Sequence, residues 1–190
     1  MANGFIQERI PTRADCEELF KKYAMLPGIV DHSLQVMHVA TALVDNLKSG
    51  VLIDRDLVVA AALLHDITKT RSLTTKERHD ISGGELLRDF GFNSLAEIVE
   101  QHVILQNFLP HGKLEEREII YYADKRVMHD RIGTIEERVQ DLVKRYGSTD
   151  EIRNLILANV RLVLDVEKKI ASYMALDIES VIHQMVYTAS

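Results

Sequence analysis

Histidine and aspartate side chains occupy helical positions in this sequence that should be buried. His32 shares a face with Val36 and Val39, since residues three, four or seven apart lie on one side of a helix. Asp124 likewise follows Ile120 by four residues. A buried charged group must be hydrogen-bonded, paired with an opposite charge or bound to a metal ion. The pattern therefore predicts a polar cluster inside the core.

The adjacent pair His65 and Asp66 ends the most hydrophobic stretch of the chain, Leu57 to Leu64. Together with His32 and Asp124 it supplies two imidazoles and two carboxylates, and a single divalent cation would satisfy all four. Mixed nitrogen and oxygen ligands suit Mn, Fe, Co, Ni or Zn better than calcium. An octahedral ion with four protein ligands keeps positions for water and a phosphate oxygen, which is a catalytic arrangement.

Each of these residues, taken alone, has an ordinary structural explanation. A single histidine on an apolar face is more often a hydrogen-bonded core residue than a ligand. Asp124 could form an ion pair with Lys125 or Arg126, and the His65-Asp66 pair could simply end a helix at a loop. The metal site is favoured because one ion accounts for all of them at once.

Composition excludes several other classes. The chain has 190 residues, eight histidines and one cysteine, Cys16, so it can form neither an intrachain disulfide nor a cysteine-rich zinc site. The net charge of −6 argues against long nucleic acid as a partner. No apolar run approaches the ~20 residues that span a bilayer, and the N-terminus lacks the apolar core of a signal peptide. We therefore expect no membrane partner and a cytoplasmic location.

Apolar residues recur every three or four positions between the three prolines, which predicts an all-α fold and a single domain over residues 1–190. Residues 67–78 lack this period and are interpreted as a loop. Residues after about 134 are interpreted as packing helices without chemistry, and their expected core is Leu155, Ile156, Val160, Leu162, Val163 and Val166. Expected helices run from Pro27 to near Gly50, from Asp54 to near His65 and from about Leu114 towards Met128, with further caps at Ser82, Asn93, Thr134, Ser148 and Asp177.

The order His32, His65-Asp66, Asp124 on successive helices resembles the H…HD…D signature of the HD-domain metal-dependent phosphohydrolases. The segment AALLHDITK, residues 61–69, strengthens the match, and the resemblance covers roughly residues 27–130. It implies a helical HD-type bundle with extra C-terminal helices at about 134–190. It also implies hydrolysis of a phosphoester or phosphoanhydride bond, commonly in a nucleotide, with these four residues as the metal ligands.

The resemblance also suggests roles around the metal. Asp66 would orient or deprotonate the attacking water, and Lys69 matches a family lysine that binds substrate phosphate. We expect Arg71 and Arg131 to add phosphate contacts. The expected partner is a small phosphorylated substrate, a nucleotide above all, and the sequence is compatible with a homo-oligomer.

His79 and His102 raise the question of a second metal ion, so the sequence leaves one or two ions open. Their positions are similar to those in the branch that includes the diadenosine-tetraphosphate hydrolases. In that branch, additional histidines join the counterpart of Asp66 around a second ion. The other histidines, at 38, 111, 129 and 183, are interpreted as structural or solvent-facing.

Two other functions fit the same residues. HD-like proteins include diiron oxygenases, and the six His and Asp residues could hold such an iron pair. A regulatory module could instead bind a nucleotide without turning it over. Lys69 beside the metal ligands favours phosphate chemistry.

Overall fold

A computed structural model describes residues 8–146 and 148–188 of the chain. The described part is mostly helical, which confirms the all-α prediction. Within it, no helix combines the length and the apolar composition that crossing a bilayer would take. The helices are α1 (Arg13–Lys22), α2 (Pro27–Asp45), α3 (Arg55–Leu64), α4 (Lys69–Thr75), α5 (His79–Asp89), α6 (Asn93–Val99), α7 (Glu116–Lys125), α8 (Ile135–Tyr146), α9 (Asp150–Tyr173) and α10 (Ile178–Thr188).

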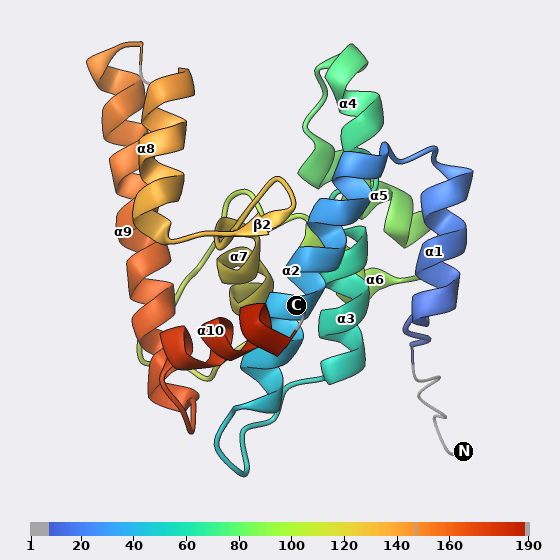
Figure 1. Ribbon diagram of the computed structural model, residues 1–190. Coiled ribbons are helices and arrows are strands. Elements are labelled where there is room, and N and C mark those ends of the chain that lie inside the picture. Colours follow the sequence, from blue (N-terminus) through green and yellow to red (C-terminus); the bar gives the residue numbers. More distant parts are fainter. Residues whose placement is uncertain (1–7, 147, 189–190) are drawn as a thin grey trace.

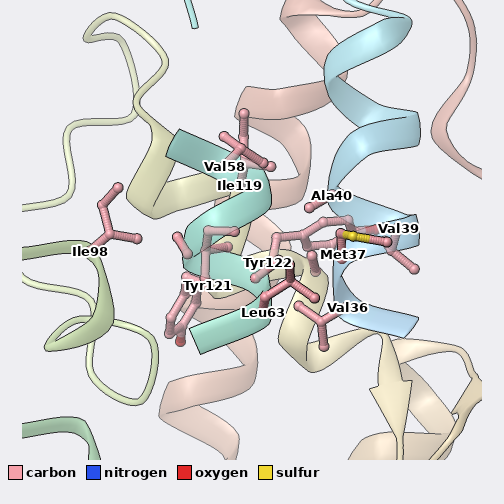
Figure 2. Packing of buried hydrophobic residues seen from close by; sticks show 14 of the residues in the cluster. Val36, Met37, Val39, Ala40, Val58, Leu63, Ile98, Ile119, Tyr121 and Tyr122 are labelled. Carbon is pink, nitrogen blue, oxygen red and sulfur yellow. The ribbon is translucent and has the colours of Figure 1, made fainter. Parts of the chain in front are cut away.

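The core lies where α2, α3 and α7 pack together (Figure 1). Val36 and Val39 of α2, Leu63 of α3 and the two tyrosines of α7, Tyr121 and Tyr122, are fully buried there. Figure 2 shows these side chains gathered around α3. Close packing of this kind holds helices rigidly, so polar side chains at the ends of α2, α3 and α7 are held in fixed positions.

Several helix starts agree with the sequence prediction. Asp54 accepts a hydrogen bond from the backbone N–H of Leu57 at 3.0 Å, and Asp177 caps α10 in the same way. Thr134 and Glu137 form the predicted capping box at the start of α8. The prediction for α9 was one residue off, because Thr149 rather than Ser148 supplies the capping oxygen.

Three elements differ from the prediction. The expected loop at 67–78 contains the short helix α4, which has no buried residues and hence no apolar period in its sequence. Helix α5 begins at His79, so Ser82 lies inside it. Helix α7 ends at Lys125, where the chain turns into a small antiparallel hairpin, β1 (Val127–Met128) and β2 (Arg131–Ile132).

Helices α8 and α9 lie side by side at one edge of the molecule (Figure 1). The C-terminal half of α9 packs against α7 through Val163, Val166 and Ile170, which are buried. Its N-terminal half departs from the predicted core, because Leu155 is 71% exposed and Ile156 is only half-buried. The chain therefore directs part of this apolar face towards an open space rather than into the core.

Candidate metal centre

The structure brings His32, His65, Asp66 and Asp124 together. Asp124 Oδ1 lies 3.0 Å from His32 Nε2 and 3.8 Å from His65 Nε2, and Asp66 Oδ2 lies 3.4 Å from His65 Nε2. All four residues are buried. Helix α2 contributes the first, the end of α3 contributes the adjacent pair, and α7 contributes the last. Their proximity follows from the packing of α3 against α2 and α7.

A second group forms on the other oxygen of Asp66. Asp66 Oδ1 lies 3.2 Å from His79 Nε2 and 3.5 Å from His102 Nε2, and the two Nε2 atoms are 3.2 Å apart. His79 begins α5, and His102 follows α6. In each of the two groups, His32/His65/Asp66 and Asp66/His79/His102, one potential ligand atom per residue lies within 4.8 Å of the others. Asp66 therefore belongs to both.

Three of the histidines are oriented by backbone carbonyls. A carbonyl oxygen only accepts hydrogen bonds, so each Nδ1 carries the proton, and the neutral imidazole keeps a lone pair on Nε2 facing the cluster. Histidines that bind metals are commonly oriented in this way. The pairs are His32 Nδ1 with His129 O at 2.9 Å, His65 Nδ1 with Ala62 O at 2.8 Å and His102 Nδ1 with Val99 O at 2.6 Å.

Two buried atoms of the cluster lack hydrogen-bond partners. They are His65 Nε2 and Asp66 Oδ1, and both belong to fully buried side chains. Leaving such an atom unsatisfied costs about 1–3 kcal/mol. A divalent cation between the two groups would satisfy both atoms, so the residues present fit a metal ion.

Electrostatics favour ionised carboxylates at this site. Burial alone would raise the pKa of Asp66, but the electrostatic effect of His65 and the close approach of His102 and His79 hold that pKa well below its usual range. Burial likewise opposes ionisation of Asp124, while Lys125 and His32 keep its pKa well below the usual range. Burial lowers the pKa of His102 and so favours its neutral form, whereas burial of His65 is outweighed by Asp66 and Asp124, which raise the pKa of that histidine. Ionised carboxylates and neutral imidazoles are the forms that bind metal ions.

Two lysines accompany the carboxylates. Lys69 Nζ lies 2.6 Å from Asp66 Oδ2, and Lys125 Nζ lies 2.7 Å from Asp124 Oδ2. Burial opposes the charge on Lys69, but Asp66 and Asp124 raise its pKa, so it remains an ammonium group. The Lys69 side chain is 38% exposed and lines the adjoining cavity. The ion pair of Asp124 with Lys125 thus exists beside the histidine contacts rather than in place of them.

The two arginines expected to bind phosphate lie outside this cavity. Arg71 pairs with Glu77 and Arg131 with Glu137, and the two arginine side chains are 52% and 61% exposed. Neither lines the cavity beside the cluster, so their role in substrate binding stays a prediction. Arg126 does not line this cavity either, and its buried guanidinium pairs with Glu179 on α10.

Sequence reasoning missed two features of the site. The carbonyl of His129 orients His32, and no side-chain pattern indicates a backbone contact of this kind. Arg138 on α8 lines the cavity, which has a volume of about 1060 Å³ and extends from the His/Asp groups to α8 and α9. Its place between Ile135 and Leu142 on the apolar face of α8 is the signal that could have identified it.

Comparison with known families agrees with this geometry. The HD domain model matches residues 29–129, and the chain therefore belongs to the HD-domain family. Proteins of this family are generally metal-dependent phosphohydrolases. The matched span includes every residue of the two His/Asp groups and ends before α8.

Several curated proteins are similar to the chain. An uncharacterized protein of Methanocaldococcus jannaschii is 31% identical over 70% of this chain and 86% of its own length. A tRNA (cytidine(56)-2'-O)-methyltransferase of Picrophilus torridus is 28% identical over 72% of this chain, but the match spans 42% of that enzyme. Ribonuclease Y of Fusobacterium nucleatum is 27% identical over 67% of this chain and 23% of its own length. No solved structure matched the chain significantly.

Proposed function

We propose that this protein is a metal-dependent phosphohydrolase that cleaves a phosphoester or phosphoanhydride bond in a small nucleotide. The observation that carries the proposal is the sharing of Asp66 by two His/Asp groups whose facing atoms, His65 Nε2 and Asp66 Oδ1, are buried without partners. Membership of the HD-domain family supports the same reaction class.

The residues divide into two sets of ligands. His32, His65, Asp66 and Asp124 would hold one divalent ion, chosen among Mn, Fe, Co, Ni and Zn by their mixed donor set. Asp66, His79 and His102 would hold a second. Divalent ions bound there would lower the pKa of a coordinated water molecule and polarise a phosphoryl group. The similarity to the diadenosine-tetraphosphate hydrolase branch remains a prediction, since none of the relatives described above bears on it.

The side chains themselves supply orientation and charge. In this proposal, Asp66 would orient the attacking water or take its proton. The ammonium group of Lys69 contacts Asp66, and the Lys69 side chain also lines the cavity. There the ammonium group can donate a hydrogen bond to a phosphate oxygen. A fixed cation at this place stabilises the negative charge that develops during phosphoryl transfer.

A substrate screen with metal-loaded protein tests the proposal. The panel contains nucleoside mono-, di- and triphosphates, dinucleoside polyphosphates and short RNA oligonucleotides. RNA is included because two of the relatives are named for tRNA methylation and for ribonuclease activity. We expect hydrolysis of at least one small nucleotide and a loss of a hundredfold or more in the His65→Ala and Asp66→Ala variants. His38→Ala is the matched control, because His38 is exposed on α2 away from the cluster.

Three results would contradict the proposal. One is a metal-loaded protein that cleaves nothing in the panel, and another is undiminished cleavage by His65→Ala and Asp66→Ala. The third is oxygen uptake after Fe(II) loading without phosphate release, which would favour the oxygenase alternative. Tight nucleotide binding with no product over hours belongs to the first result and would favour a sensing module.

A further inference from the structure

The cavity beside the His/Asp groups has one wall that the HD-domain match does not include. Helices α8 and α9 start after residue 129, where the match ends, yet both contribute lining residues along the cavity. Figure 1 shows these two helices as a pair standing beside the helices that carry the ligands. The space open to a substrate is therefore bounded by elements additional to the family core.

The wall formed by α8 and α9 is largely apolar. Its lining positions repeat at helical spacing, which gives each helix a mainly apolar face towards the cavity, with Arg138 and Arg145 on α8 and Asn159 on α9 as its polar members. Leu155 is 71% exposed there and Leu73 of α4, which also lines the cavity, is 54% exposed. Apolar faces that stay open beside polar groups are typical of ligand clefts. The apolar lining of the two helices comprises Ile135, Val139, Leu142, Leu155, Ile156, Val160 and Val163.

Arg138 interrupts this wall with a positive charge. Its Nε is buried and has no hydrogen-bond partner, and no ion pair joins it to any carboxylate of the described residues. It lies close enough to Lys69 for the two positive charges to repel each other. Lys69 and Lys125, in contrast, already contact carboxylates. Arg138 also lowers the pKa of Asp141, but Asp141 forms its ion pair with Arg145, so Arg138 lines the cavity without an ion pair of its own among the described residues.

Charge is not uniform over the cavity. Asp31 of α2 and Asp130 of the hairpin also line it, and both are exposed. An anionic group is therefore favoured near Arg138 and Lys69 rather than anywhere in the space. A guanidinium group is suited to phosphate because its planar donors can bind two oxygens at once.

We propose that α8 and α9 form the specificity wall of this site, where Arg138 binds a phosphate oxygen and the apolar face binds the base of a nucleotide. The choice of substrate class rests on the proposed function. The occupant that this wall selects is a phosphorylated molecule with a large apolar or aromatic group, such as a nucleoside monophosphate, rather than inorganic phosphate or polyphosphate.

The inference is tested by isothermal calorimetry, which measures the affinity of the Mn²⁺-loaded protein for two probes, inorganic phosphate and adenosine monophosphate. We expect the nucleotide to bind at least tenfold more tightly than phosphate. Arg138→Gln should weaken both probes by about ten- to a hundredfold, the usual effect of losing a charge-assisted hydrogen bond, and Arg138→Lys should restore part of this loss. Leu142→Ala should weaken the nucleotide alone.

Matched controls lie on α9 outside the cavity. Arg153→Gln removes an exposed arginine that pairs with Asp150, and Leu157→Ala removes a half-exposed leucine that does not line the cavity. Neither should change the affinity for either probe. Equal affinities in Arg138→Gln, Leu142→Ala and the wild type would overturn the inference. A dimer in light scattering that Leu142→Ala dissociates, with unchanged nucleotide affinity, would also overturn it, because a second copy would then occupy the wall.

The design separates this inference from the proposed function. If the wild type binds both probes as expected but cleaves no substrate, the phosphohydrolase proposal fails while the binding wall stands. If the wild type cleaves nucleotides and Arg138→Gln leaves both KM and kcat unchanged, the inference about the specificity wall is overturned, while the proposed function stands.

Discussion

Asp66 has two carboxylate oxygens that face different neighbours. Oδ2 contacts His65 and Lys69, whereas Oδ1 contacts His79 and His102. Loss of this one side chain should therefore disable both His/Asp groups, while loss of His79 or His102 should disable one. The geometry therefore predicts a different metal stoichiometry for loss of Asp66 than for loss of His79 or His102.

His129 provides a test of positioning through the backbone. Its carbonyl accepts the hydrogen bond from His32 Nδ1, and its φ of 58° is in the left-handed region, which costs an ordinary side chain roughly 1–2 kcal/mol. We expect His129→Gly to keep Mn²⁺ affinity, because glycine adopts this conformation freely. His129→Val should weaken Mn²⁺ affinity about tenfold, since β-branched residues disfavour it and the carbonyl would move.

Calorimetric titration measures the Mn²⁺ affinity of both His129 variants. Each removes the same imidazole, so a difference between them reports on the backbone rather than on the side chain. Equal weakening in His129→Gly and His129→Val would mean that the imidazole itself matters, contrary to this account.

Helical face drew attention to His32, His102 and Asp124 in the sequence, whereas His79 was added only because its position resembles that in a known family. Sequence reasoning could not identify the carbonyl of His129, because every residue has a carbonyl and only the fold selects one. Arg138 was missed for another reason. Its helix was interpreted as packing, and whether an apolar face meets the core or a cavity depends on tertiary structure.

At the scale of elements, a buried ion pair joins the helix that carries Asp124 to the wall of the cavity. Lys169 of α9 donates to Glu118 of α7 at 2.7 Å, and both side chains are at most 2% exposed. Burial raises the pKa of Glu118, and Lys169 opposes that rise. The pair fixes the position of α9 relative to α7, and with it the distance from the wall to the ligands.

Breaking this pair should destabilise the protein strongly. Lys169→Met leaves Glu118 buried without its partner, and we expect a loss of about 3 kcal/mol in the free energy of unfolding. The double variant Glu118→Gln with Lys169→Met should recover much of that loss, because no buried charge remains. Urea denaturation measures both. A single variant as stable as the wild type would show that water reaches the carboxylate and that the pair does not fix α9.

Helix boundaries were predictable where capping side chains mark them, as at Asp54 and Asp177. They were not predictable where no apolar face exists. Helix α4 buries none of its residues, and its hydroxyl groups bond to carbonyls of the preceding turn, as Ser72 does with Lys69. The hairpin after α7 was missed because its strands have two residues each, too few for an alternating pattern.

At the scale of the whole molecule, Cys16 reports on the integrity of the core. It is fully buried on α1, and burial raises the pKa of its thiol to about 12. A folded-state pKa above the unfolded value means that this group stabilises the fold fully below about pH 8.5. That contribution is lost as the pH rises towards 12.

Alkylation of Cys16 should accordingly be slow in the native protein. A shift of about three pH units corresponds to roughly a thousandfold less thiolate at pH 8, so we expect iodoacetamide to react at least a hundredfold faster in urea. The Cys16→Ser variant has no thiol and serves as the control for alkylation at other side chains. Rapid native alkylation that levels off near pH 9 would show an exposed thiol and an α1 that is not docked on the core.

Metal binding links the site to the stability of the whole fold, because ions that bind only the folded state raise the free energy of unfolding. Counting the ions bound to each variant tests the central claim most directly. Titration with Mn²⁺ should give two ions per chain for the wild type, one for His79→Ala or His102→Ala, and none for Asp66→Ala. A wild-type chain that binds no divalent ion, or an Asp66→Ala variant that binds as many as the wild type, would contradict the claim that Asp66 is shared by two metal sites.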